Sequence, residues 1–136
     1  MKRSIVTPFI FLTALVMLFS CTAKIEGTGG TVSLTVNGYN EVLCENHSVT
    51  VEAGTTAFDV FVSVLRGLEI PFTVSGSGSN VYIKSVNGVK EFDHGPESGW
   101  IYTVNGENLS ISCGSYQIND GDSITFKYIT EYEENI

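Results

Sequence analysis

Histidine is scarce in this chain, and its scarcity excludes common kinds of catalytic site. The sequence contains two histidines among 136 residues, His47 and His94, and each lies in a polar turn. A Ser-His-Asp or Cys-His centre needs a histidine base within hydrogen-bond reach of its nucleophile. The Gly-rich motifs that cradle phosphates are also missing. We therefore predict that the protein is not an enzyme.

Positive charge is equally scarce. Seven lysines and arginines stand against fifteen acidic residues, which gives a formal net charge of −8 at pH 7. Beyond Arg3, the basic residues are scattered along the chain: Lys24, Arg66, Lys84, Lys90 and Lys127. Binding of nucleic acid needs clustered positive charge. We therefore predict no nucleic-acid partner.

The first twenty residues have the pattern of an export signal. Lys2 and Arg3 form a basic start, and an apolar run covers residues 5–19. The run is short for a membrane-spanning helix, which needs about 20 apolar residues. It ends in Leu18-Phe19-Ser20-Cys21, a lipobox that lipoprotein signal peptidase would cleave before the cysteine. An ordinary secretory signal with an incidental cysteine is the alternative.

Cleavage before Cys21 predicts a lipoprotein on the extracytoplasmic face of the cell membrane. The Cys21 thiol would receive diacylglycerol and its amine a further acyl chain such as palmitate, giving the multi-chain anchoring that one chain cannot provide. Without residues 1–20 the chain has five basic and fifteen acidic residues, a net charge of −10. The remaining 116 residues are enough for one domain with a single core.

We divide this mature part into three segments. Residues 21–30 join the lipidated cysteine to a Gly-rich stretch, which we predict to be a flexible tether. Residues 31–130 form the domain, and residues 131–136 form an acidic tail that we expect to fray.

Two further cysteines, Cys44 and Cys113, remain in an oxidising compartment. An even pair there predicts a disulfide. The bond would close a loop of about 70 residues, worth roughly 4 kcal/mol in the chain-entropy model. Two buried free thiols are the alternative, because the sequence alone does not establish the distance between the cysteines.

Alternation of apolar and polar residues predicts strands and one helix. The expected strands lie within residues 31–36, 41–51, 72–74, 81–86, 99–104 and 123–129. Between the second and third strands, one helical face is apolar: Ala57, Val60, Phe61, Val64, Leu65 and Leu68. Thr56 and Asp59 have the spacing of an N-terminal capping box, and Gly67 is the expected stop. This order predicts an α+β fold, a β-grasp-like mixed sheet packed on a single helix.

Turn signals separate the strands. Three Asn-Gly pairs predict hairpin turns: Asn37-Gly38, Asn87-Gly88 and Asn105-Gly106. The segment Asp120-Gly121-Asp122 resembles the start of a calcium loop but lacks the required glycine and the bidentate glutamate, so it also predicts a turn. Asp93, His94 and Glu97 lie in a Gly/Pro-containing loop, where a divalent metal site is the alternative to simple solvation. We predict no metal.

Aromatic residues gather in the last third of the domain. Trp100, Tyr102 and Tyr116 lie beside loops of Gly, Ser and Asn, a combination typical of a site where rigid rings meet a flat ligand. Phe126 and Tyr128 continue the series along the last strand. The alternative is that the rings line the core of a sheet.

Several of these segments resemble one bacterial family. They are Gly95-Pro96-Glu97-Ser98-Gly99-Trp100-Ile101-Tyr102-Thr103-Val104-Asn105-Gly106, Cys113-Gly114-Ser115-Tyr116-Gln117-Ile118-Asn119-Asp120-Gly121-Asp122, Gly54-Thr55-Thr56-Ala57-Phe58-Asp59-Val60, Val81-Tyr82-Ile83 and Ser85-Val86-Asn87-Gly88. In order and spacing they are similar to a domain of unknown function that is grouped with the carboxy-terminal domain of transcobalamin and intrinsic factor. The resemblance covers about residues 31–130.

In the eukaryotic relatives this domain closes over the upper face of cobalamin. The resemblance therefore implies a transcobalamin-like corrinoid-binding protein, delivering its ligand to a membrane transporter or a second surface protein. The implied ligand site consists of Trp100, Tyr102, Asn105, Gly106, Ser112 and Tyr116. The second hypothesis is a protein-interaction or adhesive module without a small-molecule ligand, which would dock a partner on a sheet edge or an aromatic patch.

Overall fold

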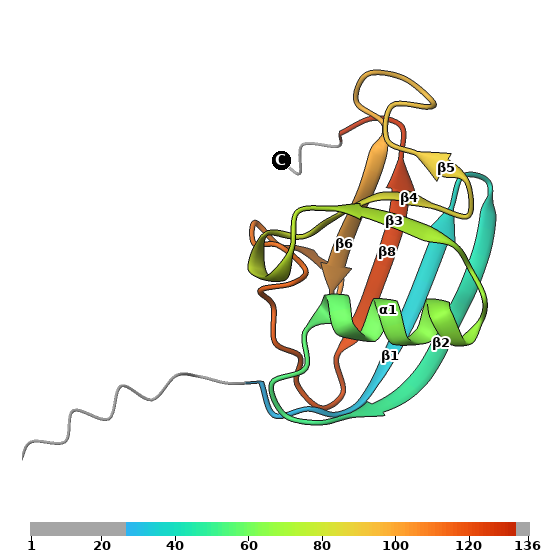
Figure 1. Ribbon diagram of the computed structural model, residues 1–136. Coiled ribbons are helices and arrows are strands. Elements are labelled where there is room, and N and C mark those ends of the chain that lie inside the picture. The colour runs from blue at the N-terminus through green and yellow to red at the C-terminus, as the bar shows by residue number, and fades with distance from the viewer. Residues whose placement is uncertain (1–26, 133–136) are drawn as a thin grey trace, which may run out of the picture.

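The computed structural model describes residues 27–132, and it has an α+β fold with one α-helix (Figure 1). The predicted class is confirmed. The large sheet contains β1 (Gly30–Gly38), β2 (Glu41–Val51), β6 (Gly99–Val104), β7 (Glu107–Asn108) and β8 (Ser123–Ile129). The remaining elements are α1 (Ala57–Gly67), β3 (Phe72–Ser75), the 3-10 turn η1 (Gly78–Asn80), β4 (Tyr82–Val86) and β5 (Val89–Lys90).

The large sheet is mixed, in the order β2-β1-β8-β6-β7. The neighbouring strands β1 and β8 run parallel, and every other pair of the sheet is antiparallel. The first and last strands of the domain therefore lie side by side, although about 90 residues separate them in the sequence.

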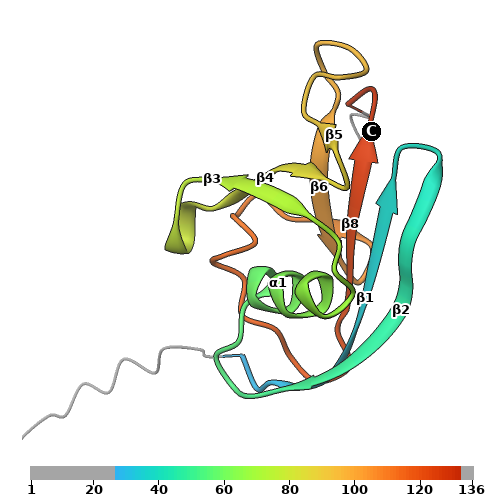
Figure 2. The same cartoon turned by 45° about the vertical axis from the view of Figure 1, so that its right-hand side comes forward.

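The small sheet, β3-β4-β5, is separate from the large one, which corrects the expectation of a single sheet. It lies on the same side of the large sheet as α1 (Figure 2). Phe61 of α1 contacts both sheets, since its ring centroid lies 4.4 Å from that of Phe126 on β8 and 5.1 Å from that of Phe72 on β3. The helix thus fills the space that the two sheets enclose.

The core follows from period-two alternation in the central strands. Val32, Leu34 and Val36 of β1 are buried and face α1, as are Ile124 and Phe126 of β8. The helix contributes its predicted apolar face: Ala57, Val60, Phe61, Val64 and Leu65. Each large apolar side chain buried here contributes about 1.5–3 kcal/mol.

The start of the helix confirms the predicted capping box, but its end differs from prediction. The Asp59 amide donates to the Thr56 hydroxyl at 3.1 Å, and the Thr56 amide donates to the Asp59 carboxylate at 2.9 Å. At the other end Gly67 is still helical and Glu69 takes the left-handed conformation, with φ 57°. The Ile70 amide then donates to the Leu65 carbonyl at 2.9 Å, so the left-handed residue that closes the helix end is Glu69 and not Gly67.

Two of the three Asn-Gly turns are confirmed. Asn87-Gly88 and Asn105-Gly106 have positive φ at both residues, as a two-residue hairpin turn favours. The prediction for Asn37-Gly38 is wrong. These residues pair with Val42 and Glu41 within the β1–β2 ladder, so Tyr39 and Asn40 form the turn, with Asn40 at φ 57°.

Residues 27–30, which were predicted to belong to the tether, are packed against the domain. The Gly27 amide donates to the Gln117 side chain at 2.8 Å, and the Gly29 amide donates to the Ile118 carbonyl at 3.2 Å. Residues 27–30 therefore pack against the loop before β8 and are not part of a flexible tether. The predicted signal segment and Cys21 lie outside the described residues, and within 27–132 no helix is long and apolar enough to span a membrane.

The predicted disulfide is wrong, because Cys44 and Cys113 are both buried and free. The Cys44 thiol on β2 donates to the Leu34 carbonyl at 3.4 Å. The Cys113 thiol lies in the chain after β7, 3.9 Å from the Val81 carbonyl. The two thiols therefore face different backbone groups.

Candidate functional site

An open pocket of about 930 Å³ lies between β6, β4 and the chain that follows β7. Side chains from distant parts of the sequence line it, including the β1–β2 turn and the end of β8. Its aromatic and apolar lining comes from Tyr39, Val81, Tyr82, Ile83, Trp100, Ile101, Tyr102, Leu109, Ile111, Phe126, Tyr128, Ile129 and Tyr132. A pocket of this size and composition can hold a drug-sized organic ligand.

Trp100 and Tyr102 form one wall of the pocket, because alternate residues of β6 point to the same face. The Trp100 indole N–H donates to the Val89 carbonyl at 3.0 Å, and its ring packs edge-on to Tyr128 at 5.4 Å. The Tyr102 ring stacks on Phe126 at 5.7 Å, and its hydroxyl donates to the Ile111 carbonyl at 2.7 Å. Both rings are half-buried, so each keeps a surface for a ligand.

Ser112 and Gly106 also line the pocket, so four of the six predicted site residues meet there. The Ser112 hydroxyl donates to the Val81 carbonyl and accepts from the Gly114 amide. These contacts join the 109–114 chain to the start of β4. Gly114 has no room for a Cβ, which would meet the Gly78 carbonyl, so a glycine allows this close approach.

Asn105 and Tyr116, the other two predicted site residues, are not among the residues that line the pocket. Both bond to Asp122, a buried carboxylate at the start of β8. The Asn105 side-chain amide donates to Asp122 at 2.9 Å, and the Tyr116 hydroxyl donates to it at 3.1 Å. Their polar groups are used to hold the loops together, since a buried carboxylate needs such donors.

The sequence analysis did not predict the two pocket residues that come from the β1–β2 turn and from the chain after β8. Tyr39 is in the β1–β2 turn, and Tyr132 follows β8. Because β1 and β8 are parallel, their C-terminal ends lie at the same end of the sheet. The sequence did not reveal this parallel pairing, so the two tyrosines could not be assigned to the pocket. The one available signal was the position of Tyr39 directly after the predicted Asn37-Gly38 turn.

The loop between β5 and β6 adds a histidine to this aromatic group but no metal site. The His94 ring stacks on Tyr39 with centroids 3.6 Å apart and meets Tyr128 edge-on at 5.7 Å. The Asp93 carboxylate accepts from the Lys90 amide at 2.8 Å. Across residues 27–132, Asp93, His94 and Glu97 form no cluster with the geometry of a metal site, nor do any other three His, Cys, Asp or Glu side chains.

A family model described as Domain of unknown function (DUF4430) matches residues 54–130, more than half of the chain. The chain belongs to the DUF4430 family. The match confirms the family expected from the sequence motifs. It includes β4, β6 and the 109–114 chain, so most of the pocket lies within the DUF4430 domain, whereas Tyr39 and Tyr132 lie outside the matched residues.

Two solved structures share this fold of the DUF4430 chain. Haptocorrin in complex with Cbi is 23% identical, with a TM-score of 0.65 over 77% of this chain and 26% of the haptocorrin chain. The DUF4430 chain thus corresponds to about a quarter of haptocorrin's length. A proposed metal-binding protein from Ruminococcus gnavus ATCC 29149 is 16% identical, with a TM-score of 0.52 over 76% of this chain and 99% of the other. A comparison with curated proteins finds no match.

Two titratable side chains of the DUF4430 pocket, Tyr102 and Cys113, are uncharged at neutral pH. Burial, together with the nearby Cys113 and Tyr116, raises the pKa of Tyr102 to about 12. Burial likewise raises the pKa of the Cys113 thiol to about 11. The remaining charged groups of the lining are Lys127 and Glu131, which have opposite signs. The wall is therefore electrically balanced, although the whole molecule is acidic.

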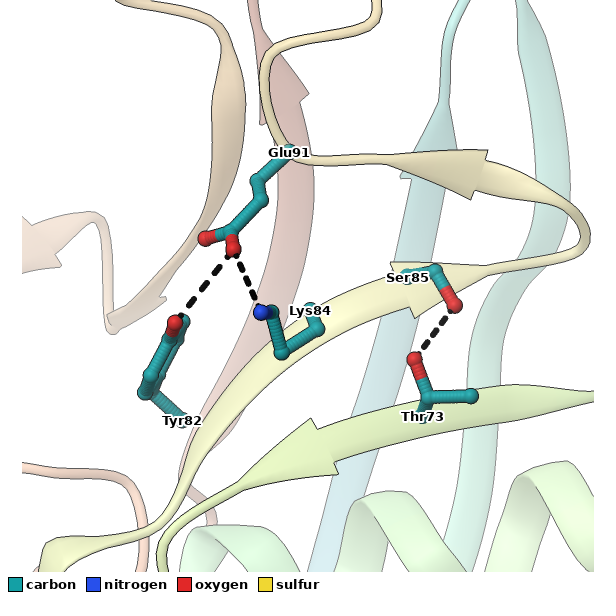
Figure 3. Close-up of polar contacts among 5 residues, drawn as sticks. All are labelled: Thr73, Tyr82, Lys84, Ser85 and Glu91. Carbon is teal, nitrogen blue, oxygen red and sulfur yellow. Dashed lines mark hydrogen bonds and ion pairs between the residues drawn. The ribbon is translucent and has the colours of Figure 1, made fainter.

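Polar contacts stiffen the small sheet beside the pocket (Figure 3). The Glu91 carboxylate accepts from the Tyr82 hydroxyl at 3.4 Å and pairs with the Lys84 ammonium at 3.0 Å. The hydrogen bond and charge of Glu91 raise the pKa of Lys84. The Thr73 and Ser85 hydroxyls bond at 2.7 Å across β3 and β4. Tyr82, which lines the pocket, is thus linked through Glu91 to Lys84 on the same strand, β4.

Proposed function

We propose that this protein binds a corrinoid or a similar flat cofactor in the pocket lined by Trp100 and Tyr102. The observation that supports this most directly is the half-buried ring pair on β6, which forms a wall of a 930 Å³ pocket. Half-buried aromatic rings offer apolar faces to a planar macrocycle at little conformational cost. Haptocorrin, with which the chain shares its fold, was crystallised with Cbi, a corrinoid ligand.

The openness of the pocket sets the expected mode of binding. A corrinoid is larger than the pocket and would be covered on one side, so part of its apolar surface would stay in water. A membrane transporter or a second surface protein would cover the other side. The proposed role is therefore to capture a ligand and deliver it for uptake.

We also propose the β-grasp class for the fold. Its support is the parallel pairing of β1 with β8 at the centre of the sheet, with the single helix α1 packed across that pair. This arrangement places the end of β8 and the β1–β2 turn together at the pocket.

Lipid anchoring through Cys21 remains part of the proposal. Cys21 lies six residues before Gly27. The start of β1, which follows Gly27, lies at the end of the sheet opposite the β1–β2 turn (Figure 1). Tyr39 and Tyr132 would then face away from the membrane. We expect Cys21→Ser to move the protein from the membrane fraction to the soluble fraction and to abolish labelling by a palmitate analogue. Membrane retention of this variant would contradict the anchor.

Titration with cobinamide and cobalamin tests the ligand. Full-length protein, purified in detergent, is titrated while the corrin absorption bands and Trp100 fluorescence are followed. We expect saturable quenching, with affinity at least tenfold weaker in Trp100→Ala, since about 1.4 kcal/mol of ring contact would be lost. Phe92→Ala is the matched control, because this exposed aromatic residue of the β5–β6 loop does not line the pocket. Absence of binding at roughly millimolar ligand would contradict the proposal.

A protein-interaction module is the second candidate, and one observation favours it. Val42, Phe92 and Tyr132 are 61%, 63% and 71% exposed, so each has apolar surface that a partner protein could cover. In this case Phe92→Ala would weaken partner binding. Corrinoid titrations would show no binding, either in the unmodified protein or in Trp100→Ala.

We propose, finally, that the protein has no catalytic activity. Support comes from the location of its histidines, because His47 is exposed on β2 and the His94 ring is stacked on Tyr39. Neither position offers a base in contact with a nucleophile.

A further inference from the structure

We infer that the pocket accepts ligands that carry uncharged amide groups and rejects the same ligands when those groups are carboxylates. The inference rests on the proposed function, because it specifies which corrinoids the site would take. Three features of the pocket lead to it: an open strand edge, a neutral lining and the sign of the charge around it.

The open strand edge is the backbone of Trp100. The Asn105 amide donates to the Ser123 carbonyl at 2.8 Å, just beyond the last pair of the antiparallel β6–β8 ladder, so that pair, Val104 and Ile124, is a non-hydrogen-bonded one. Such pairs alternate along the ladder. Trp100 therefore points its N–H and C=O away from β8, toward the edge of the sheet.

Within residues 27–132, no backbone hydrogen bond from another segment reaches Trp100 at that edge. The strand on this side, β7, pairs only with Thr103 and Val104. The open stretch is short, because the Tyr102 hydroxyl ties the chain after β7 to β6 through the Ile111 carbonyl. A donor and an acceptor are thus available over one residue, which suits a small group better than an added strand.

An amide group matches this edge and a carboxylate does not. An amide donates through its NH₂ and accepts through its oxygen, whereas an ionised carboxylate only accepts. A carboxylate placed here could bond to the Trp100 N–H but would face the Trp100 carbonyl with its own lone pairs. Asn40, Asn80 and Asn108, which also line the pocket, offer further groups that both donate and accept.

The charge of the wall strengthens this selection. Among the lining residues, Lys127 is balanced by Glu131, so no excess positive charge is present to neutralise a bound carboxylate. The chain as a whole has a net charge of −8, which repels anions at long range. Partial burial of an unpaired carboxylate is costly. The same surroundings impose no such cost on a neutral amide.

Paired titrations test the inference. Full-length protein in detergent is titrated with cobinamide and with the corresponding corrinoid whose side-chain amides have been converted to free carboxylates. We expect the carboxylate form to bind at least tenfold more weakly. Amide hydrogen exchange supplies a second readout: cobinamide should slow exchange at Trp100 but not at Ile101, whose N–H points toward β8. Glu131→Lys should reduce the difference in affinity between the amide and carboxylate forms of the corrinoid.

Each outcome has a separate meaning. Equal or tighter binding of the carboxylate form would overturn this inference and leave the proposed corrinoid function intact. Unchanged exchange at Trp100 with saturating cobinamide would also overturn it, as would a Glu131→Lys variant with an unaltered ratio of affinities. If neither corrinoid binds, the proposed function itself fails, and the inference fails with it.

Discussion

Asp122 shows how a single residue decides the roles of its neighbours. Its buried carboxylate accepts hydrogen bonds from Asn105, Tyr116 and the Asn119 amide. Two residues that the family resemblance placed in the ligand site therefore serve to close the loops around the start of β8. A polar or aromatic residue in a Gly-rich segment looks the same in the sequence whether it binds a ligand or holds two loops together.

Cys113 yields a prediction at this scale. Burial raises the pKa of its thiol from the ordinary 9.0 to about 11, so the folded protein holds this proton more tightly than the unfolded chain does. The resulting stability is fully present below pH 9 and is lost as the pH rises through about 11. The shift in pKa corresponds to a loss of at most about 2.7 kcal/mol in the free energy of unfolding. Because solvent screens the site, we expect a loss of about 1–2 kcal/mol.

Urea unfolding at a series of pH values from 8 to 11 would measure this loss. In Cys113→Ala the decline over that window should be shallower, whatever the absolute stability of the variant. A decline of equal steepness in both proteins would mean that Cys113 does not contribute to it. Tyr102, whose pKa is raised from 10.0 to about 12, should add a decline that begins near pH 10 in both proteins alike.

Among the elements, the β1–β2 hairpin shows why local turn signals can be overruled. Asn37-Gly38 has the best turn sequence, but pairing of Val36 with Cys44 continues the ladder to Gly38 and Glu41. The register keeps Val32, Leu34 and Val36 in the core, and this burial outweighs a local preference. Along the open edge of β2, a bulge near Asn46 and the exposed Glu41 and Glu45 discourage pairing with other chains.

The helix supports a second prediction. α1 has 11 residues, several of them β-branched, so its first turn depends on the Thr56 cap. Thr56→Ala should lower the free energy of unfolding by about 1 kcal/mol, because the Asp59 amide loses its acceptor. Thr55→Ala is the matched control, since the capping bonds involve Thr56 and not Thr55. Equal effects of the two substitutions in urea unfolding would contradict a specific capping role.

On the scale of the whole molecule, the two sheets and the helix enclose one core without a covalent link between Cys44 and Cys113. We therefore expect dithiothreitol to leave the Tm of the protein unchanged. A disulfide closing this loop would add roughly 4 kcal/mol and raise the Tm by more than 10 °C. A large fall in Tm on reduction, or fewer than two thiols titrated in the unfolded protein under non-reducing conditions, would contradict the free state of the cysteines.

The pocket also forms at the level of the whole molecule, through the pairing of distant strands. The parallel pairing of β1 with β8 gathers the β1–β2 turn and the chain after β8 at one end, next to the β6 rings. The small sheet supplies the opposite wall through Val81, Tyr82 and Ile83. A pocket assembled in this way needs the complete domain, so no short segment of the chain would retain it.

The amino-acid sequence by itself determined the α+β class, the positions of six strands, the helix with its Thr56 cap and the placement of Trp100 and Tyr102 beside a pocket. These features depend on residues close together in the chain, through alternation, helical spacing and local hydrogen bonds. Tertiary structure decided the separation of the two sheets, the distance between Cys44 and Cys113, and the inclusion of Tyr39 and Tyr132 in the pocket. Each of these depends on which distant strands become neighbours, and pairing over about 90 residues is selected by burial of the whole core rather than by any local pattern.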